Sequence, residues 1–307
     1  MKILVTGGAG FIGYNLVEKL LTEGHRVIIV DKLYKQDTNK FYQNKNCSCF
    51  IGDICHKRAI RDIMEYVKPD VVVHLAAVAG VRNSFEQPLK YIKNNIEGTL
   101  NILECMKELG IKKLIFASSS SVYGDYESAK VFSEDMTSIK PISPYAVTKL
   151  CGEQLIYTYS KAYNISAICL RFFTVYGPRQ REDLAIRKFA TAIRDSKPID
   201  MYGDGTSVRD YTYVDDIVDG ILSAIEYNKS TFEIINLGGG NPISLKEMIN
   251  YIEEGIGKEA LVNRLPMQKG DVKRTSANIS KAKKLLNYEP KVTFKEGIKR
   301  FIKWLNF

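Results

Sequence analysis

The chain begins with a strand, a glycine loop and a helix in direct succession, and this order constrains the fold more than any other feature. Residues 2–6 (KILVT) are apolar and strand-like, and residues 12–23 carry apolar side chains at helical spacing. Between them, the loop GGAGFIG spaces three glycines evenly: Gly7, Gly10 and Gly13. The first permits a tight turn, the second a close approach of backbone to ligand, and the third close packing of the helix. Free amides at the start of that helix favour a pyrophosphate, so the segment predicts a dinucleotide-binding βαβ unit.

The same alternation of strand and helix continues along the chain. We expect further strands at 26–30, 71–75, 113–117, 165–171 and 232–237, and helices at 57–67, 89–109, 144–163, 184–196 and 214–227. Capping-box patterns at Ser244/Glu247 and Thr293/Glu296 predict two more helix starts. Short apolar strands separated by helices predict an α/β fold with a doubly wound parallel sheet, a Rossmann domain, over residues 1–171. A smaller α/β substrate-binding lobe is expected over 172–307, with segments near 210–238 returning to the sheet.

The end of the second strand indicates which dinucleotide the loop would bind. Asp31 lies 18 residues after Gly13, where a carboxylate accepts both hydroxyls of the adenosine ribose and repels a 2′-phosphate. This favours NAD over NADP, although Lys32 weakens the preference; a strand-end acid that caps a turn is the alternative. Asp53 is placed to meet the adenine amino group, and small residues at 75–77 (LAA) leave room for the cofactor.

A tyrosine and a lysine four residues apart suggest acid–base chemistry. Tyr145 and Lys149 fall on one face of the helix at 144–163. An ammonium beside the phenol is expected to lower the phenol's pKa, which makes the phenolate available as a base. The serines at 118–121 follow the strand at 113–117, at the carboxyl edge of the sheet where ligands bind, and one of their hydroxyls can share the substrate proton. In this order along one chain, the glycine loop, Asp31, the serines and Tyr-x-x-x-Lys predict an enzyme.

Composition limits the other possibilities. The 307 residues carry a formal net charge of +9, which favours anionic partners, but the charges are spread along the chain and no nucleic-acid motif accompanies them. Most of the excess is therefore interpreted as solvated surface. No apolar run approaches a membrane span or a secretory signal, so a cytoplasmic protein without membrane contact is expected. The six cysteines form no Cys-x-x-Cys, and we expect reduced thiols and no metal site.

Seven stretches together resemble the extended short-chain dehydrogenase/reductase family, in its nucleotide-sugar epimerase and dehydratase group. They are TGGAGFIG, HLAAVAGVR, SSSSVYG, YAVTK, RFFTVYGPRQRED, YGDGTSVRDYTYVDD and the late GDV. The resemblance spans nearly the whole chain. It implies an isomerase with tightly bound NAD that oxidises carbon 4 of a UDP-sugar to a ketone, lets the sugar rotate and reduces its other face. It also implies a homodimer built from the helices at 89–109 and 144–163.

The resemblance, together with the motifs above, assigns residues to three roles. The catalytic residues are Ser119, Tyr145 and Lys149. The cofactor-binding residues are Gly7, Gly10, Phe11, Ile12, Gly13, Asp31, Lys32, Asp53, Ile54, Leu75, Ala76, Ala77, Asn95, Tyr145, Lys149 and Phe172. The substrate-binding residues are Arg82, Ser119, Ser120, Ser121, Thr174, Arg181, Tyr202, Arg209 and Asp271.

Related chemistries are separated by the residues after Ser119. Dehydratases of the group carry Asp-Glu there and UDP-glucuronate decarboxylases a Glu two positions on, whereas this chain has Ser120 and Ser121. Thr174 stands where UDP-glucose 4-epimerases have Asn, which favours UDP-glucuronate, converted to UDP-galacturonate. Glu182 replaces the Pro usual in the uronate pattern. UDP-glucose/UDP-galactose 4-epimerase, UDP-glucuronate decarboxylase and a non-enzymatic NAD-binding regulator are the alternatives.

Overall fold

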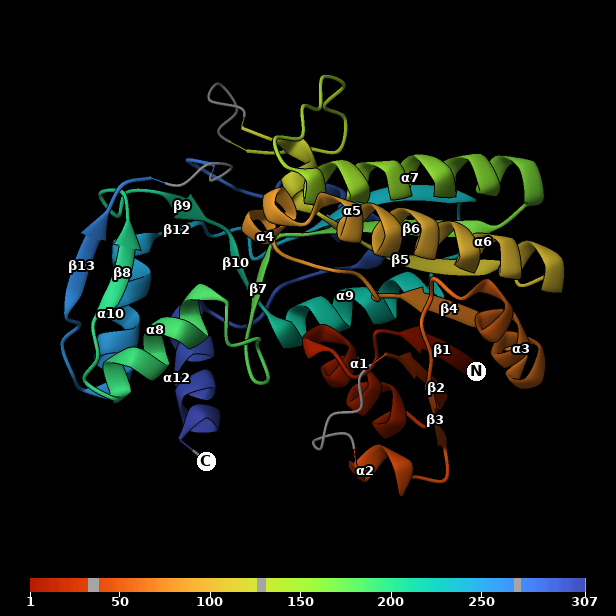
Figure 1. Ribbon diagram of the computed structural model, residues 1–307, viewed down its shortest axis with the longest axis horizontal. Coiled ribbons are helices and arrows are strands. Elements are labelled where there is room, and N and C mark those ends of the chain that lie inside the picture. The colour runs from red at the N-terminus through yellow and green to blue at the C-terminus, as the bar shows by residue number, and fades with distance from the viewer. Residues whose placement is uncertain (33–38, 126–130, 268–271, 307) are drawn as a thin grey trace.

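The computed structural model describes residues 1–32, 39–125, 131–267 and 272–306 (Figure 1). Seven strands of this described part form one parallel sheet in the order β11-β6-β5-β4-β1-β2-β3. Their bounds are β1 (Lys2–Thr6), β2 (Arg26–Asp31), β3 (Cys47–Ile51), β4 (Val71–His74), β5 (Lys113–Ser119), β6 (Ser166–Phe172) and β11 (Phe232–Leu237). The strand order reverses between β1 and β4, which opens a crevice at the carboxyl ends where such sheets bind ligands. The predicted doubly wound α/β fold is confirmed.

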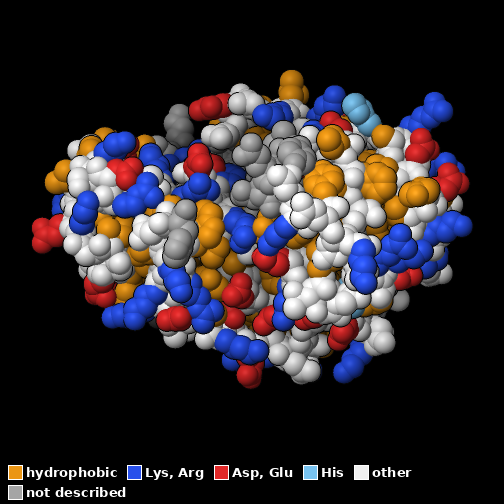
Figure 2. Space-filling view, turned by 90° about the horizontal axis from the view of Figure 1, so that it is seen from below, with side chains coloured by type: hydrophobic (Ala, Val, Ile, Leu, Met, Phe, Trp, Pro, Cys, Tyr) orange, Lys and Arg blue, Asp and Glu red, His pale blue; other side chains and the backbone are white. Residues whose placement is uncertain are grey.

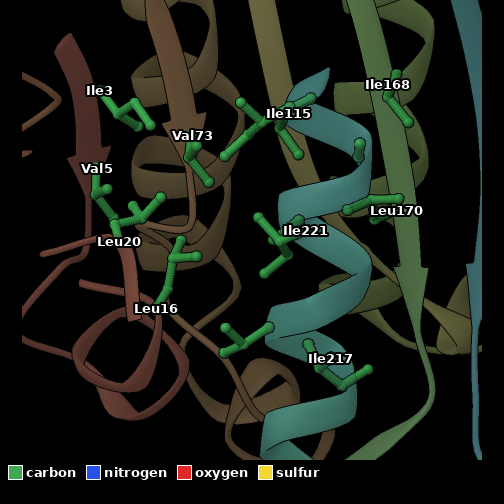
Figure 3. Close-up of a cluster of buried hydrophobic side chains, with 14 of the residues drawn as sticks. Ile3, Val5, Leu16, Leu20, Val73, Ile115, Ile168, Leu170, Ile217 and Ile221 are labelled. Carbon is green, nitrogen blue, oxygen red and sulfur yellow. The ribbon is translucent and has the colours of Figure 1, made fainter. Parts of the chain in front are cut away.

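Helices cover both faces of the sheet. One face carries α1 (Phe11–Thr22), α9 (Val214–Glu226) and α11 (Ser280–Leu286), and the other carries α3 (Lys57–Val67), α6 (Gly98–Leu109) and α7 (Pro144–Tyr163). Figure 3 shows the first interface, where apolar side chains of α1 and α9 meet those of four strands: Ile3, Val5, Val73, Ile115, Ile168 and Leu170 against Leu16, Leu20, Ile217 and Ile221. Full burial of each such side chain contributes roughly 1.5–3 kcal/mol, so these faces hold the helices and the loops they carry in register.

A smaller lobe lies beside the carboxyl edge of the sheet, at the left of Figure 1. It contains β8 (Ile199–Tyr202) paired in parallel with β13 (Val262–Leu265), together with α8 (Ala185–Arg194), α10 (Leu245–Ile256) and α12 (Phe294–Leu305). These helices bury a core of their own that includes Phe189, Ile252 and Phe301. The predicted capping box at α10 is confirmed, with Ser244 and Glu247 each bonded to the other's amide.

The chain enters the lobe after β6 and returns to the sheet before its end. Short ladders mark the crossings: β7 (Thr174–Tyr176) pairs with β10 (Tyr211–Tyr213), and β9 (Val208–Arg209) pairs with β12 (Ile243–Ser244). After β10, α9 packs on the sheet and β11 pairs with β6. Residues 210–238 therefore connect the two parts of the molecule directly behind the ligand edge.

The structure corrects several expected elements. The single helix expected at 89–109 is divided into α5 (Pro88–Tyr91), a π-helical segment η2 (Ile92–Glu97) and α6. Several short elements were not predicted, among them α2 (Asn39–Tyr42), α4 (Val81–Glu86), the 3₁₀ turn η3 (Ser120–Tyr123), and the short strands and α11 that follow β6. The second capping box is half formed, because Thr293 accepts the Glu296 amide while the Glu296 carboxylate pairs with Arg300. Local pattern places these helices but does not show where tertiary contacts break or re-bond a turn.

The basic excess forms no single patch on the face in Figure 2, where Lys and Arg side chains are mixed with Asp and Glu. Many of these cations lie in surface ion pairs, for example Arg61 with Glu65 at 2.9 Å. Within the described ranges, no helix has the length and apolar character to cross a membrane. In the same ranges, His, Cys, Asp and Glu form no cluster able to hold a metal ion.

Candidate active site

A cavity of about 210 Å³ opens at the carboxyl edge of β5 and β6, between the sheet and the lobe. Its lining comes from the ends of strands and from the loops that follow them: Val81, Ser119, Ser120, Ser121, Gly124, Ile142, Ser143, Tyr145, Phe172, Phe173, Thr174, Arg209, Val272 and Thr275. Seven of the predicted site residues thus meet here, namely Ser119, Ser120, Ser121, Tyr145, Phe172, Thr174 and Arg209. The cavity is the candidate active site.

Ser119 and Tyr145 come together because the carboxyl end of β5 lies next to the first turn of α7 in space. The Ser119 hydroxyl lies 2.7 Å from the hydroxyl of Ser121 and accepts the Ser121 amide at 3.2 Å, which fixes the η3 turn. Ser143 caps α7 by accepting the Ala146 amide at 3.2 Å, so Tyr145 sits in a well-anchored first turn. The Tyr145 phenol is hydrogen-bonded to Ser119, and this pairing supplies a short route for a proton.

The expected lowering of the Tyr145 pKa by Lys149 is wrong. Burial raises the pKa of Tyr145 above its usual value, and the Ser119 hydrogen bond and the Arg181 charge offset burial only in part. Lys149 donates instead from Nζ to the carbonyl oxygen of Ala117 at 2.7 Å. Burial also lowers the pKa of Lys149 to about 8. The lysine is therefore held against β5, and the sequence spacing did not reveal this competing carbonyl.

The Asn95 side chain connects two elements that border the site. Its amide oxygen accepts the Val78 amide at 2.8 Å, and its nitrogen donates to the Val78 carbonyl and to Thr148 Oγ1, both at 3.0 Å. Asn95 lies in the π-helical segment, which turns it towards α7. Asn95 thus links the loop after β4 to the helix that carries Tyr145.

His74, at the end of β4, is a structural residue. Its Nδ1 is 2.7 Å from Thr6 Oγ1 and its Nε2 is 3.1 Å from Thr99 Oγ1. Burial, followed by the Lys149 charge, lowers the pKa of His74 to about 3, so the ring is neutral at physiological pH.

The glycine loop has the shape that a dinucleotide pyrophosphate requires. Gly7 has a φ of +72°, and a Cβ there would lie 2.8 Å from the Ala76 nitrogen. A Cβ at Gly13 would lie 2.2 Å from the Gly7 carbonyl oxygen, so the third glycine permits the helix to pack on the loop itself. No side chain of the described residues caps α1, whose first amides are presented by Phe11, Ile12 and Gly13. These residues fit NAD.

The end of β2 carries the expected acid. Asp31 Oδ2 accepts the Ala9 amide at 3.0 Å, which ties the carboxylate to the glycine loop. Lys32 pairs with Asp53 at 3.0 Å and with Asn94 at 2.5 Å. Although burial opposes ionisation of Asp53, the Cys55 amide and Lys32 bring its pKa below the usual value.

The remaining cofactor candidates lie on the strands and helix next to the loop. Ile54 is buried against Gly98. The backbone of Ala76 packs against Gly7, and its amide donates to Thr6 Oγ1 at 3.2 Å. Leu75 and Ala77 flank it after β4, half-buried like Ala76. All three stand where the loop and β4 approach each other most closely.

Three of the described substrate candidates, Arg82, Arg181 and Tyr202, lie outside the lining of the cavity. The Arg82 guanidinium stacks on the Tyr202 ring at 4.8 Å, which joins α4 to β8 of the lobe. Arg181 donates two hydrogen bonds to the Asp183 carboxylate at 2.9 and 2.6 Å, and it lines a second cavity of about 490 Å³ with Gly10 and Phe11. Asp271 lies outside the described residues.

Glu182, the departure from the uronate pattern, is not part of the active-site lining but lines the second cavity, next to Arg181. It is largely exposed and pairs with Arg187 of α8 at 2.9 Å. The extra acid therefore fastens the loop to α8 and is absent from the lining of the active-site cavity.

Sequence reasoning missed part of the lining. Thr275 is buried and accepts the Asp210 amide at 3.3 Å, and Val272 lines the same cavity three residues earlier in the chain. Val81 and Ser143 begin α4 and precede α7. The Ser-Pro pair at 143–144 was a readable helix-start signal, whereas nothing in local pattern brings residues 272–275 to β5.

Known proteins of one family match this chain over most of its length. The model of the NAD dependent epimerase/dehydratase family matches residues 3–238. The chain belongs to this family. It is 46% identical over 310 residues to a UDP-glucuronate 4-epimerase of Thermodesulfobacterium geofontis, covering 98% of this chain and 95% of that protein.

Solved structures agree with this family over the whole chain. A UDP-glucuronic acid 4-epimerase from Bacillus cereus, in complex with UDP-glucuronic acid and NAD, has a TM-score of 0.93 at 38% identity and covers 100% of this chain and 99% of that chain. A UDP-glucose 4-epimerase from Thermotoga maritima with UDP-glucose has a TM-score of 0.92 at 35% identity, with 100% and 99% covered. The fold is thus shared by enzymes described with either sugar.

Proposed function

We propose that the protein is an NAD-dependent 4-epimerase that interconverts UDP-glucuronate and UDP-galacturonate. The observation that carries this proposal is the lining of the active-site cavity. It combines the Ser119–Tyr145 pair with the hydroxyls of Ser120, Ser121 and Thr174, and no described residue of the lining is an Asp or Glu. Acids of the kind that elimination requires are therefore missing from the described lining, while hydroxyl donors suit a carboxylate.

Within this proposal, Tyr145 moves the proton of the sugar's 4-hydroxyl. As the phenolate, Tyr145 takes that proton, with help from the Ser119 hydroxyl, and becomes the neutral phenol. The phenol gives the proton back to the 4-oxygen when hydride returns and the opposite configuration forms. Bound NAD⁺ supplies the acceptor for hydride from carbon 4 and the donor that returns it. Lys149, behind Tyr145, supplies positive charge from a position fixed by Ala117.

Arg209 is the cation of the described cavity lining, and we assign it to the diphosphate. Thr174, with Ser120 and Ser121, would bind the uronate carboxylate. A carboxylate held at a fixed angle to the ring resists loss of carbon dioxide from the 4-keto sugar, which is a β-keto acid. The identity to the UDP-glucuronate 4-epimerase of T. geofontis supports this choice of sugar.

We also propose the two-part division of the chain and a homodimer. The sheet domain, with residues 1–171 and the returning α9 and β11, would bind NAD, and the lobe would bind the nucleotide. Exposed apolar side chains lie on α5, η2 and α7, the helices expected at the dimer interface: Leu89, Ile92, Val147 and Tyr157. Such a cluster on neighbouring helices supports self-association.

The test is incubation of the purified protein with UDP-glucuronate, followed by identification of the product sugar. UDP-galacturonate as product supports the proposal. UDP-xylose would identify a decarboxylase, and turnover of UDP-glucose alone would identify the other epimerase. Absence of all three reactions, with NAD bound, would leave the regulatory alternative.

A further inference from the structure

A buried ion pair lies directly behind the candidate active site and has no part in the mechanism above. Arg171 of β6 donates from Nε and Nη2 to the two carboxylate oxygens of Glu153 in α7, at 2.9 and 2.7 Å. Ser118 of β5 donates a third hydrogen bond to Glu153, at 2.5 Å. Arg171 is 2% exposed and Glu153 is 0% exposed. The Glu153 carboxylate is thus fixed by donors from two strands.

Stability alone gives little reason for this pair. The desolvation of two buried charges offsets most of their attraction, so a well-packed apolar pair would hold β6 to α7 as well. Each member, however, adjoins a residue of the site. Ser118 precedes Ser119, Arg171 precedes Phe172, and Glu153 follows Lys149 by one turn of α7.

Lys149 is the charged active-site group on which the Glu153–Arg171 ion pair would act. Its ammonium is held by the Ala117 carbonyl and lies 5.0 Å from the centre of the Phe116 ring. The titratable groups around it are Glu153 and Tyr145 on its own helix, His74 of β4, and Cys169 and Arg171 of β6. His74 is neutral because burial lowers its pKa, and Cys169 is neutral because burial raises its pKa. Glu153 is the carboxylate in this set.

We propose, on the basis of the epimerase function above, that Glu153 is a positioning residue that keeps Lys149 cationic and that Arg171 limits this effect. Glu153 attracts the lysine charge across one helical turn. Arg171 competes for the same carboxylate and also repels the lysine. The two partners of the ion pair therefore act on Lys149 in opposite directions. The direction of the Lys149 pKa agrees, since burial lowers it and Glu153 raises it.

This opposition distinguishes positioning from a structural role. Glu153→Gln keeps the shape and hydrogen-bonding oxygen but removes the negative charge, so Lys149 should lose its proton at lower pH. Arg171→Met removes the competing cation, so Lys149 should lose its proton at higher pH. Each shift should be about 1 pH unit, the usual size for one nearby charge. A structural role alone would destabilise both variants without opposite shifts.

The experiment measures the Lys149 titration by NMR of ¹³C-lysine-labelled protein saturated with NAD. The Lys149 signal is assigned by its loss in Lys149→Met. Arg171→Lys, which keeps the cation, and Glu104→Gln, which neutralises a carboxylate of α6 bonded to Tyr159, are controls expected to titrate like the wild type. The double variant Glu153→Gln/Arg171→Met should lie between the single variants.

Shifts in opposite directions support the proposal, and shifts in the same direction or no shift overturn it. Should Arg171→Met fail to fold, Ser118→Ala replaces it, because loss of one hydrogen-bond donor leaves the Glu153 charge less compensated and should move the Lys149 titration upward. The NMR titration needs no turnover, so failure of the epimerase proposal would appear separately as absent product. In an active enzyme, the alkaline limb of the rate profile should move with the NMR titration.

Discussion

A hydrogen bond of 2.7 Å joins Lys149 Nζ to the main-chain carbonyl oxygen of Ala117. It connects α7 to β5 two residues before Ser119. The bond therefore sets how the helix that carries Tyr145 sits over the strand that carries Ser119. Lys149, which the sequence suggested as a partner of the Tyr145 phenol, thus fixes the position of α7 relative to β5.

The pH dependence of turnover should follow Lys149. Because burial lowers the Lys149 pKa to about 8, the epimerisation rate should fall as pH rises through that value. The unfolded chain keeps the ordinary lysine pKa of 10.5 and so binds more protons between the two values, which means that Lys149 makes the folded protein more stable as pH rises through this window. Rate profiles and denaturation of wild type and Lys149→Met test this; a pH-independent difference in unfolding free energy between them would contradict it.

Tyr145→Phe should reduce kcat by roughly 10²–10⁴-fold, the usual contribution of a positioned acid–base group. NAD content and thermal unfolding should change little, since only the hydroxyl is removed. Tyr157→Phe is the matched control, because this tyrosine lies on the same helix and is 45% exposed. Equal losses in the two variants would show that the Tyr145 hydroxyl is not the proton-transfer group.

Thr174→Ala should raise KM for UDP-glucuronate by about 10-fold or more, the value of one hydrogen bond to a charged group. It should leave KM for UDP-glucose nearly unchanged and increase release of carbon dioxide. Thr174→Ser keeps the hydroxyl and should resemble the wild type. Product analysis by chromatography separates these outcomes, and equal effects on both sugars would argue against a carboxylate contact.

Gly13→Ala should abolish tight NAD binding. The new Cβ would lie 2.2 Å from the Gly7 carbonyl and 2.7 Å from Gly8 Cα, so the loop must move out of its pyrophosphate-binding shape. Gly24→Ala serves as control: its Cβ meets open space, and only the left-handed backbone, at a φ of +81°, is strained, at roughly 1–2 kcal/mol. Calorimetric titration with NAD should show loss of affinity in the first variant and retention in the second.

Leu89→Arg should weaken the proposed homodimer. Leu89 of α5 is 79% exposed, and a charge there would be buried between copies. Tyr66→Arg is the control, because Tyr66 is 80% exposed but belongs to α3, which is not one of the helices expected at the interface. Light scattering should give the 34.7 kDa monomer for Leu89→Arg and twice that mass for wild type and control. A monomeric wild type would refute the dimer.

Local sequence pattern predicted most of the fold and the residues at the centre of the site. The glycine loop and Asp31 were predicted where the structure has them, because each depends on spacing within one βαβ unit, and the strand at 232–237 followed from its own short apolar run. The meeting of Ser119 with Tyr145 followed from the rule that parallel strands end at one edge.

What local pattern could not give depends on contacts between distant segments. The π-helical turn that directs Asn95 to Thr148 interrupts a helix whose apolar spacing looks continuous. Arg181 has Asp183 as its partner, and Thr275 reaches the cavity from far along the chain. The Tyr145 pKa depends on burial, which a spacing of four residues does not report.

The late return of β11 to the sheet has a consequence for synthesis on the ribosome. When β1 to β6 have emerged, α9 and β11 are still to come, so Ile115, Ile168 and Leu170 lack their covering helix. A nascent chain at that stage displays an apolar surface and an unpaired strand edge, both of which favour aggregation or chaperone binding. The lobe elements α8 and β8 are thus translated before α9 and β11 can close the sheet, and a ribosome that stops between β8 and β11 leaves the cofactor domain open.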